Sequence, residues 1–185
     1  MKNALVAAAL LLGACACAPQ NDFVALSYEA ADALLRGARR ELADDATIIY
    51  GVFTPVGQPG TSSPFGQIFA EQIASRLAQN GVGVVEVRLR EAIAVREGGP
   101  YALSDDVRDV ARRVQARAAL AGSYVVASGY ALVTARLIDV ATGLVLSAWD
   151  RRVPLGYADY ALFGVEVVPW WGGDGYRRRR LWLAS

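Results

Sequence analysis

The sequence contains no histidine, only two cysteines and a single lysine among its 185 residues. Without histidine, the chain lacks the commonest general base of enzymes and the commonest protein ligand of transition metals. Both cysteines, Cys15 and Cys17, lie near the start, so they cannot cross-link a folded domain through a disulfide bond or build a zinc site. We therefore predict a protein that is not an enzyme and that has no catalytic residues, metal site or cofactor.

Long apolar runs and an excess of one charge are also missing. A membrane-spanning helix needs about 20 apolar residues, and no stretch beyond the first twenty residues approaches that length. The chain carries 19 basic and 18 acidic residues, which gives no general attraction to nucleic acid. A composition that is 54% hydrophobic and 20% charged is typical of a packed globular domain. The length suits one such domain with a leader and a tail.

Residues 1–14 have the pattern of an export signal. Lys2 supplies a positive charge, residues 4–12 form an apolar run too short to cross a bilayer, and small residues follow. The sequence Leu12-Gly13-Ala14-Cys15 resembles the lipobox of bacterial lipoproteins. That resemblance implies cleavage between Ala14 and Cys15, acyl chains such as palmitate on the Cys15 thiol, and acylation of the new amino group.

Lipid attachment at Cys15 would anchor the chain stably, because one acyl chain is marginal but two suffice. Residue 16 is Ala rather than Asp, which by the same resemblance favours sorting to the outer membrane. An ordinary secretory signal, cut after Ala16 or Ala18, is the alternative. If Cys15 is the lipidated residue, Cys17 is left over as an idle thiol near the membrane or as a cross-link.

The mature chain predicts an α/β (α+β) domain. Helices are expected from Ser27, from Ser63 with Pro64 at the first helical position, and from Ser104. Strands are expected over residues 47–53, 82–89, 119–127, 130–140 and 144–153. The order α-β-α-β-α-β-β-β predicts a mixed sheet of about five strands with helices packed on it. The predicted divisions are a lipidated linker at 15–26, the domain at 27–155 and an irregular tail at 156–185.

Residues that could suggest chemistry have simpler explanations. Ser63 and Ser104 could be nucleophiles, but no histidine is available to activate them, and helix capping explains both. Asp105 and Asp106 could bind a metal, but acidic residues are expected at a helix start because of the helix dipole.

The tail carries two clusters of distinctive composition. Trp170 and Trp171 follow a proline, and Arg177, Arg178, Arg179 and Arg180 are consecutive. Such residues are typical of a surface that meets lipid phosphates, polyanions or an acidic partner. A solvated tail, with tryptophans packed on the chain's own domain, is the alternative.

Several segments resemble the FlgO family of flagellar outer-membrane lipoproteins. They are Ser62–Ala74 (SSPFGQIFAEQIA), Val84–Leu89 (VVEVRL), Gly98–Val107 (GGPYALSDDV), Ala119–Tyr124 (ALAGSY) and Val133–Leu155 (VTARLIDVATGLVLSAWDRRVPL). The resemblance covers residues 27–155 in order. Its closing strands also resemble the amino-terminal α/β domain of TolB-like proteins.

This resemblance implies a periplasm-facing domain, held at the outer membrane by the lipid on Cys15, that supports the flagellum and motility. Its partners would be envelope or flagellar proteins rather than nucleic acid, and self-association remains open. A similar module occurs in periplasmic lipoproteins that assemble curli pores or activate peptidoglycan synthases. A binding module of such an envelope machine is therefore the alternative function.

Overall fold

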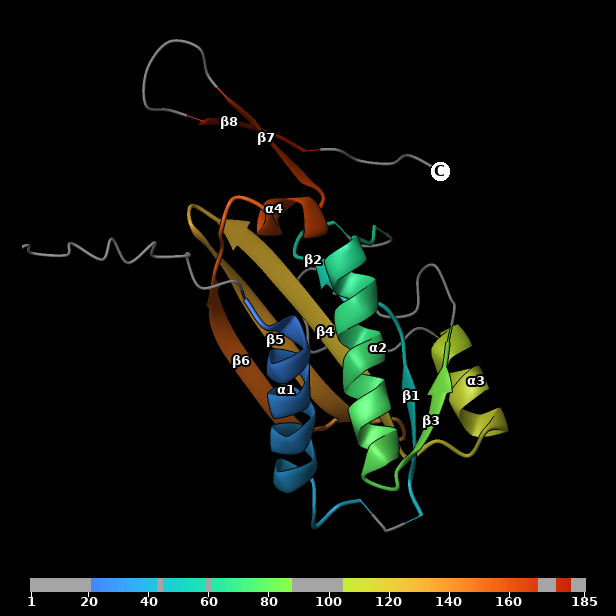
Figure 1. Ribbon diagram of the computed structural model, residues 1–185. Helices are drawn as coiled ribbons and strands as arrows, with labels where there is room; N and C mark the ends of the chain where they lie inside the picture. The colour runs from blue at the N-terminus through green and yellow to red at the C-terminus, as the bar shows by residue number, and fades with distance from the viewer. Residues whose placement is uncertain (1–20, 43–44, 59–60, 88–104, 170–175, 181–185) are drawn as a thin grey trace, which may run out of the picture.

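The computed structural model describes residues 21–42, 45–58, 61–87, 105–169 and 176–180. The chain folds into a mixed sheet with helices packed on it, as the sequence predicts, and the helices lie on both faces (Figure 1). Three strands, β1 (Thr47–Tyr50), β3 (Gly83–Glu86) and β4 (Ala118–Ala127), are mutually parallel. Two more, β5 (Tyr130–Asp139) and β6 (Val145–Pro154), extend the sheet as antiparallel neighbours in the order β3-β1-β4-β5-β6.

The crossover helices lie on opposite faces of the sheet. Helix α2 (Pro64–Gln79) lies between β1 and β3 in the chain, and α3 (Asp105–Arg113) lies between β3 and β4. In the sheet, β3 and β4 are the two neighbours of β1, so the two connections step in opposite directions. Right-handed crossovers that step in opposite directions along a sheet must use opposite faces. Ile48 accordingly packs with residues of α2, whereas its neighbour Ile49 packs with Ala111 of α3.

Helix α1 (Phe23–Gly37) lies beside α2 and covers β5 and β6. The prediction that Ser27 caps this helix is wrong. Asp22 is the cap, and its Oδ1 accepts a hydrogen bond from the backbone N–H of Ala25 at 2.9 Å. Ser27 is buried inside the helix, where its hydroxyl contacts the Val24 carbonyl oxygen and Oε1 of Gln72 on α2.

The beginning of α2 is as predicted. Ser63 is the N-cap, Pro64 follows at the first helical position, and the buried stripe includes Phe69, Ile73 and Leu77. Ile68 lies in the same helix but is exposed. The cap Ser104 predicted for α3 lies outside the described residues.

The strand predicted over 47–53 is shorter in the structure, because β1 ends at Tyr50. After a break, the short β2 (Thr54–Pro55) begins just beyond the predicted range and also pairs with β4. Phe53 lies at the break, where its ring packs over Gly122 so closely that a Cβ there would lie 2.1 Å from the ring. The break therefore places a large aromatic side chain at the centre of the core.

The expectation of an irregular segment after residue 155 is wrong for three stretches. Helix α4 (Asp159–Leu162) is followed by β7 (Val165–Pro169) and β8 (Tyr176–Arg180), which pair as an antiparallel hairpin. Phe163, after α4, is buried and stacks on Phe65 with ring centroids 4.1 Å apart. The packed core thus extends beyond the predicted domain boundary.

Candidate functional site

The chain enters the domain beside α4. The Asn21 side-chain amide donates hydrogen bonds to the Pro154 carbonyl oxygen and to Oδ2 of Asp159, both at 2.6 Å. The buried Asp159 carboxylate also accepts from the Gly156 backbone N–H at 2.8 Å. Cys15 lies only six residues before Asn21. At about 3.5 Å per residue, the linker between them spans at most about 21 Å.

The arginine run of the tail emerges from this same end. The hairpin of β7 and β8 follows α4 directly and projects from the domain (Figure 1). Arg177, Arg178, Arg179 and Arg180 all lie within β8, with Arg180 opposite Val165 in the register. Arginine is not among the residues that are enriched in strands. Pairing with the valine-rich β7 explains why these residues form a strand.

The other predicted site residues lie outside the described residues. These are Ala14, Cys15, Trp170 and Trp171. Lipidation and cleavage at residues 14 and 15 therefore stay predictions, as does an interaction surface formed by the tryptophans.

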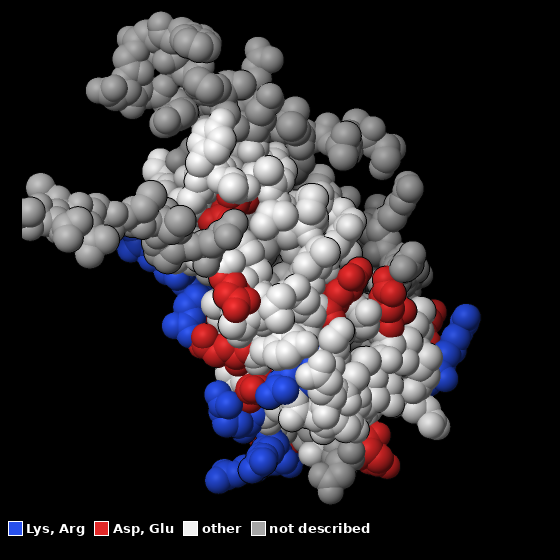
Figure 2. All heavy atoms as spheres, in the orientation of Figure 1, with Lys and Arg blue, Asp and Glu red and all other residues white. Residues whose placement is uncertain are grey.

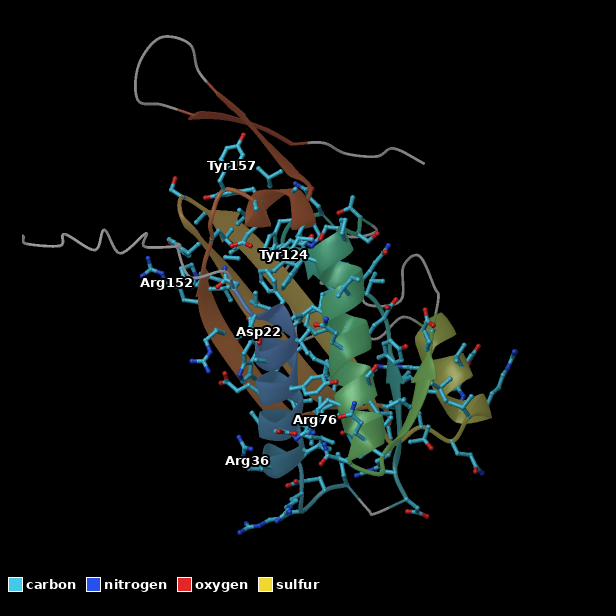
Figure 3. The ribbon with its side chains drawn as sticks, viewed as in Figure 1. Asp22, Arg36, Arg76, Tyr124, Arg152 and Tyr157 are labelled. Atoms are coloured by element: carbon cyan, nitrogen blue, oxygen red, sulfur yellow. The ribbon has the colours of Figure 1, made fainter. Side chains whose placement is uncertain are left out.

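A groove at the opposite end of α1 was not predicted from the sequence. It has a volume of about 400 Å³ and lies between the C-terminal ends of α1 and α2. We call it the arginine groove; its lining residues are Asp32, Leu35, Arg36, Arg39, Leu42, Ala46, Arg76, Asn80 and Val82. Figure 3 shows Arg36 and Arg76 at this end and Asp22 near the other end of α1.

The wall of the groove is held by one ion pair between the two helices. Nε and Nη2 of Arg76 donate to Oδ1 and Oδ2 of Asp32 at 2.9 and 3.0 Å. The hydrogen bond from Arg76 lowers the pKa of Asp32 although burial opposes it, and the charge of Arg36 lowers it further. The carboxylate is therefore ionised at neutral pH, and the two-pronged contact fixes the helices relative to each other.

The groove could not be recognised in the sequence because its arginines come from separate segments. Arg36 lies in the last turn of α1, Arg39 in the following turn, and Arg76 in the last turn of α2. Each helix end alone suggests only a favourable interaction with the helix dipole. Their convergence depends on the packing of α1 against α2.

The candidate nucleophile Ser63 has a structural role. Its Oγ accepts from the Gly66 backbone N–H at 3.1 Å and from the Tyr124 hydroxyl at 2.6 Å. Burial raises the pKa of Tyr124. The phenol therefore stays protonated and donates a hydrogen bond to Ser63. Within the described part of the chain, no group of three or more His, Cys, Asp or Glu side chains is placed to hold a metal ion.

The family model described as FlgO protein matches residues 28–158. The chain belongs to the FlgO family. Its predicted resemblance is thus confirmed, and FlgO membership supports an accessory role at the envelope or the flagellum. No curated protein matches this FlgO chain in a sequence comparison. Among its described residues, no helix has the length and apolar character that a membrane crossing requires.

A solved structure shares the fold of this FlgO-family domain. The LpoB C-terminal domain from Salmonella enterica is 14% identical and has a TM-score of 0.53, covering 73% of this chain and 100% of that chain. The LpoB domain from Escherichia coli is 15% identical, with a TM-score of 0.43 and coverages of 74% and 99%. A PelC dodecamer from Paraburkholderia phytofirmans is 20% identical, with a TM-score of 0.36 and coverages of 66% and 83%.

Proposed function

We propose that this FlgO-family protein is an outer-membrane lipoprotein that supports the flagellum and motility through protein contacts in the periplasm. The chain is cut between Ala14 and Cys15, and acyl chains on Cys15 hold it at the membrane. The observation that carries the proposal is the family match over residues 28–158. The lipobox-like sequence at residues 12–15, a short linker ahead of this domain, supports the placement.

The arrangement of the domain fits such an anchor. Asn21 is tied to Pro154 and Asp159, so a linker of at most about 21 Å would hold the α4 end close to the bilayer. The hairpin with Arg177–Arg180 leaves the domain at this end. Clustered arginines next to a membrane attract the phosphates of anionic lipids.

We therefore assign membrane-surface contact to the tail, namely Trp170, Trp171 and the four arginines of β8. Replacing all four arginines with serine should weaken binding of the protein to phosphatidylglycerol vesicles and leave binding to phosphatidylcholine vesicles unchanged. Equal binding of the parent and the variant to the anionic vesicles would remove this role.

A complementation experiment tests the functional proposal. In the bacterium that encodes the chain, deletion of its gene should reduce flagellation or swimming. The parent gene and a Cys17→Ser variant should restore motility, whereas Cys15→Ser should not, because only Cys15 carries the proposed anchor. Normal flagella and normal swimming in the deletion strain would contradict the proposal.

The fold match to LpoB favours one alternative, a binding module of another envelope machine. The match covers the whole LpoB C-terminal domain at a TM-score of 0.53. Under this alternative, deletion would leave swimming intact and instead impair cell-wall integrity or secretion. Measuring swimming and detergent sensitivity in the same deletion strain separates the two functions.

A further inference from the structure

The arginine groove has an uncompensated positive charge. Arg36, Arg39 and Arg76 line it, but Asp32 supplies the only carboxylate among the lining residues. That carboxylate is already occupied by its two hydrogen bonds to Arg76. Arg36 and Arg39 are exposed, and neither forms an ion pair with another described residue. The groove can therefore accept further negative charge from outside the domain.

Helix-dipole stabilisation accounts for only part of this cluster. Arg36 and Arg76 each lie in the last turn of a helix, where a cation is favourable. Arg39 lies beyond the end of α1, yet it lines the same groove. Figure 2 shows basic side chains gathered at this end of the molecule.

Part of the groove lining is apolar. Leu35, Leu42 and Val82 are half-buried, with one side packed against the main core. A volume of about 400 Å³ lies within the range of sites that accept small ligands or side chains. An occupant with both a carboxylate and an apolar side chain would match the arginines and the apolar side chains of the lining together.

The position of the groove favours a protein over a membrane as the occupant. It lies at the C-terminal end of α1, whereas Asn21 and the β7–β8 hairpin lie at the other end (Figures 1 and 3). Helix α1 has 15 residues, which separates the two ends by about 22 Å. If the chain is anchored through Cys15, the groove faces away from the bilayer.

We propose that the arginine groove binds an acidic segment of a partner protein that contains an apolar side chain. Carboxylates of the segment pair with Arg36 and Arg39, and the apolar side chain packs on Leu35, Leu42 and Val82. The Asp32–Arg76 pair positions the two helices that form the groove. The proposal deepens the proposed function, on which the periplasmic location of the partner rests.

Peptide titration of the full mature chain in zwitterionic micelles tests this assignment. The probe is a short fluorescent peptide of alternating Asp and Leu, with the same peptide in empty micelles as the blank. Binding should weaken at least about tenfold in Arg36→Glu/Arg39→Glu, since charge reversal replaces attraction with repulsion. The matched control, Arg108→Glu/Arg113→Glu, reverses two exposed arginines of α3 outside the groove and should bind as the parent does.

Two further probes separate the acidic–apolar segment from a general anion effect. A peptide of alternating Asp and Ser, and inorganic phosphate, should both bind clearly more weakly than the Asp–Leu peptide. Equal binding of these probes would overturn the proposal, as would equal losses in the groove variant and the α3 variant. If the glutamate variant loses its thermal unfolding transition, Arg36→Gln/Arg39→Gln replaces it, and the same weakening is expected in smaller degree.

This titration can fail while the proposed function stands. If deletion impairs swimming but the groove variant binds the peptide as the parent does, the groove assignment is wrong and the flagellar role remains. If peptide binding depends on Arg36 and Arg39 but deletion leaves swimming intact, the groove serves a different envelope partner.

Discussion

Asp139 shows how one buried carboxylate organises the turn between β5 and β6. Its Oδ1 accepts from the backbone N–H and the hydroxyl of Thr142 at 2.8 and 2.9 Å, and its Oδ2 lies 2.9 Å from Nη1 of Arg117. Burial alone would raise the pKa of Asp139, but the hydrogen bonds from Thr142 and the charge of Arg117 together lower it. The turn is completed by Gly143 at a φ of +76°, a conformation that favours glycine.

We expect Asp139→Asn to destabilise the domain by about 1–3 kcal/mol at pH 7, because a buried charge-assisted interaction is lost. A lowered folded-state pKa contributes stability that is present above the ordinary value of 3.8 and is lost as the pH falls below it. The difference between the variant and the parent should therefore shrink at pH 3. Urea unfolding at the two pH values measures it.

Asp150→Asn is the matched control, because Asp150 is an exposed carboxylate on β6. Its effect should stay within about 0.5 kcal/mol at both pH values. A loss in Asp139→Asn that is unchanged between pH 7 and pH 3 would refute the electrostatic role of this side chain.

The Ser63 hydroxyl joins the start of α2 to the core. Ser63→Ala removes the helix cap and leaves the buried Tyr124 hydroxyl without its acceptor, which should cost about 2–3 kcal/mol. Tyr124→Phe leaves the cap intact and should cost only about 1 kcal/mol. The double variant should lose less than the sum, since no orphaned hydroxyl remains. A denaturation double-mutant cycle with strictly additive losses would disprove the coupling.

At the scale of elements, the segment SSPFG illustrates what a sequence can predict. Ser63 and Pro64 act through local backbone chemistry, so the start of α2 was predicted correctly. The need for Gly66 could not be foreseen. A Cβ at this position would lie 2.1 Å from the Phe53 carbonyl oxygen, a contact between distant segments.

The start of α1 was predicted wrongly for a related reason. Ser27 and Asp22 are both good caps in isolation, and the choice depends on packing. Ser27 is fully buried and contacts Gln72 of α2. Extending the helix back to Phe23 brings that ring 5.6 Å from Phe65 and 6.3 Å from Phe163. Tertiary contacts thus override the local signal.

Helix α4 belongs to the folded domain although it lies beyond the predicted boundary. Phe163 is buried against Phe65 and Tyr124. Phe163→Ala should therefore cost about 3 kcal/mol or more, as expected for a buried aromatic side chain. Leu162→Ala, at its exposed neighbour in the last position of α4, should change stability by less than about 0.5 kcal/mol. Thermal unfolding of both variants tests the boundary; equal effects would indicate that α4 does not stabilise the core.

The whole molecule has two ends with different chemistry. Asn21, α4 and the arginine-bearing β8 lie at one end, and the arginine groove lies at the other. The sequence predicted the lipid attachment and the tail arginines, because both are contiguous motifs. It could not predict that the start of the domain and the tail arginines lie at the same end of the molecule, nor that the groove exists. Both depend on how α1 packs against segments that are distant in the sequence.

The two ends would have separate roles only if the chain is anchored at its start. Anchoring through Cys15 holds the α4 end at the membrane and presents the groove to the periplasm. A soluble secreted chain would have no fixed orientation, and the division between a membrane end and a partner end would lose its meaning.

Intact mass spectrometry of the mature protein, extracted from membranes of the bacterium that encodes it, tests this account most directly. The account predicts a chain that begins at Cys15 and carries the added mass of acyl groups on that residue, and a Cys15→Ser variant without that mass. A chain that begins after Ala16 or Ala18 and carries no lipid would contradict it.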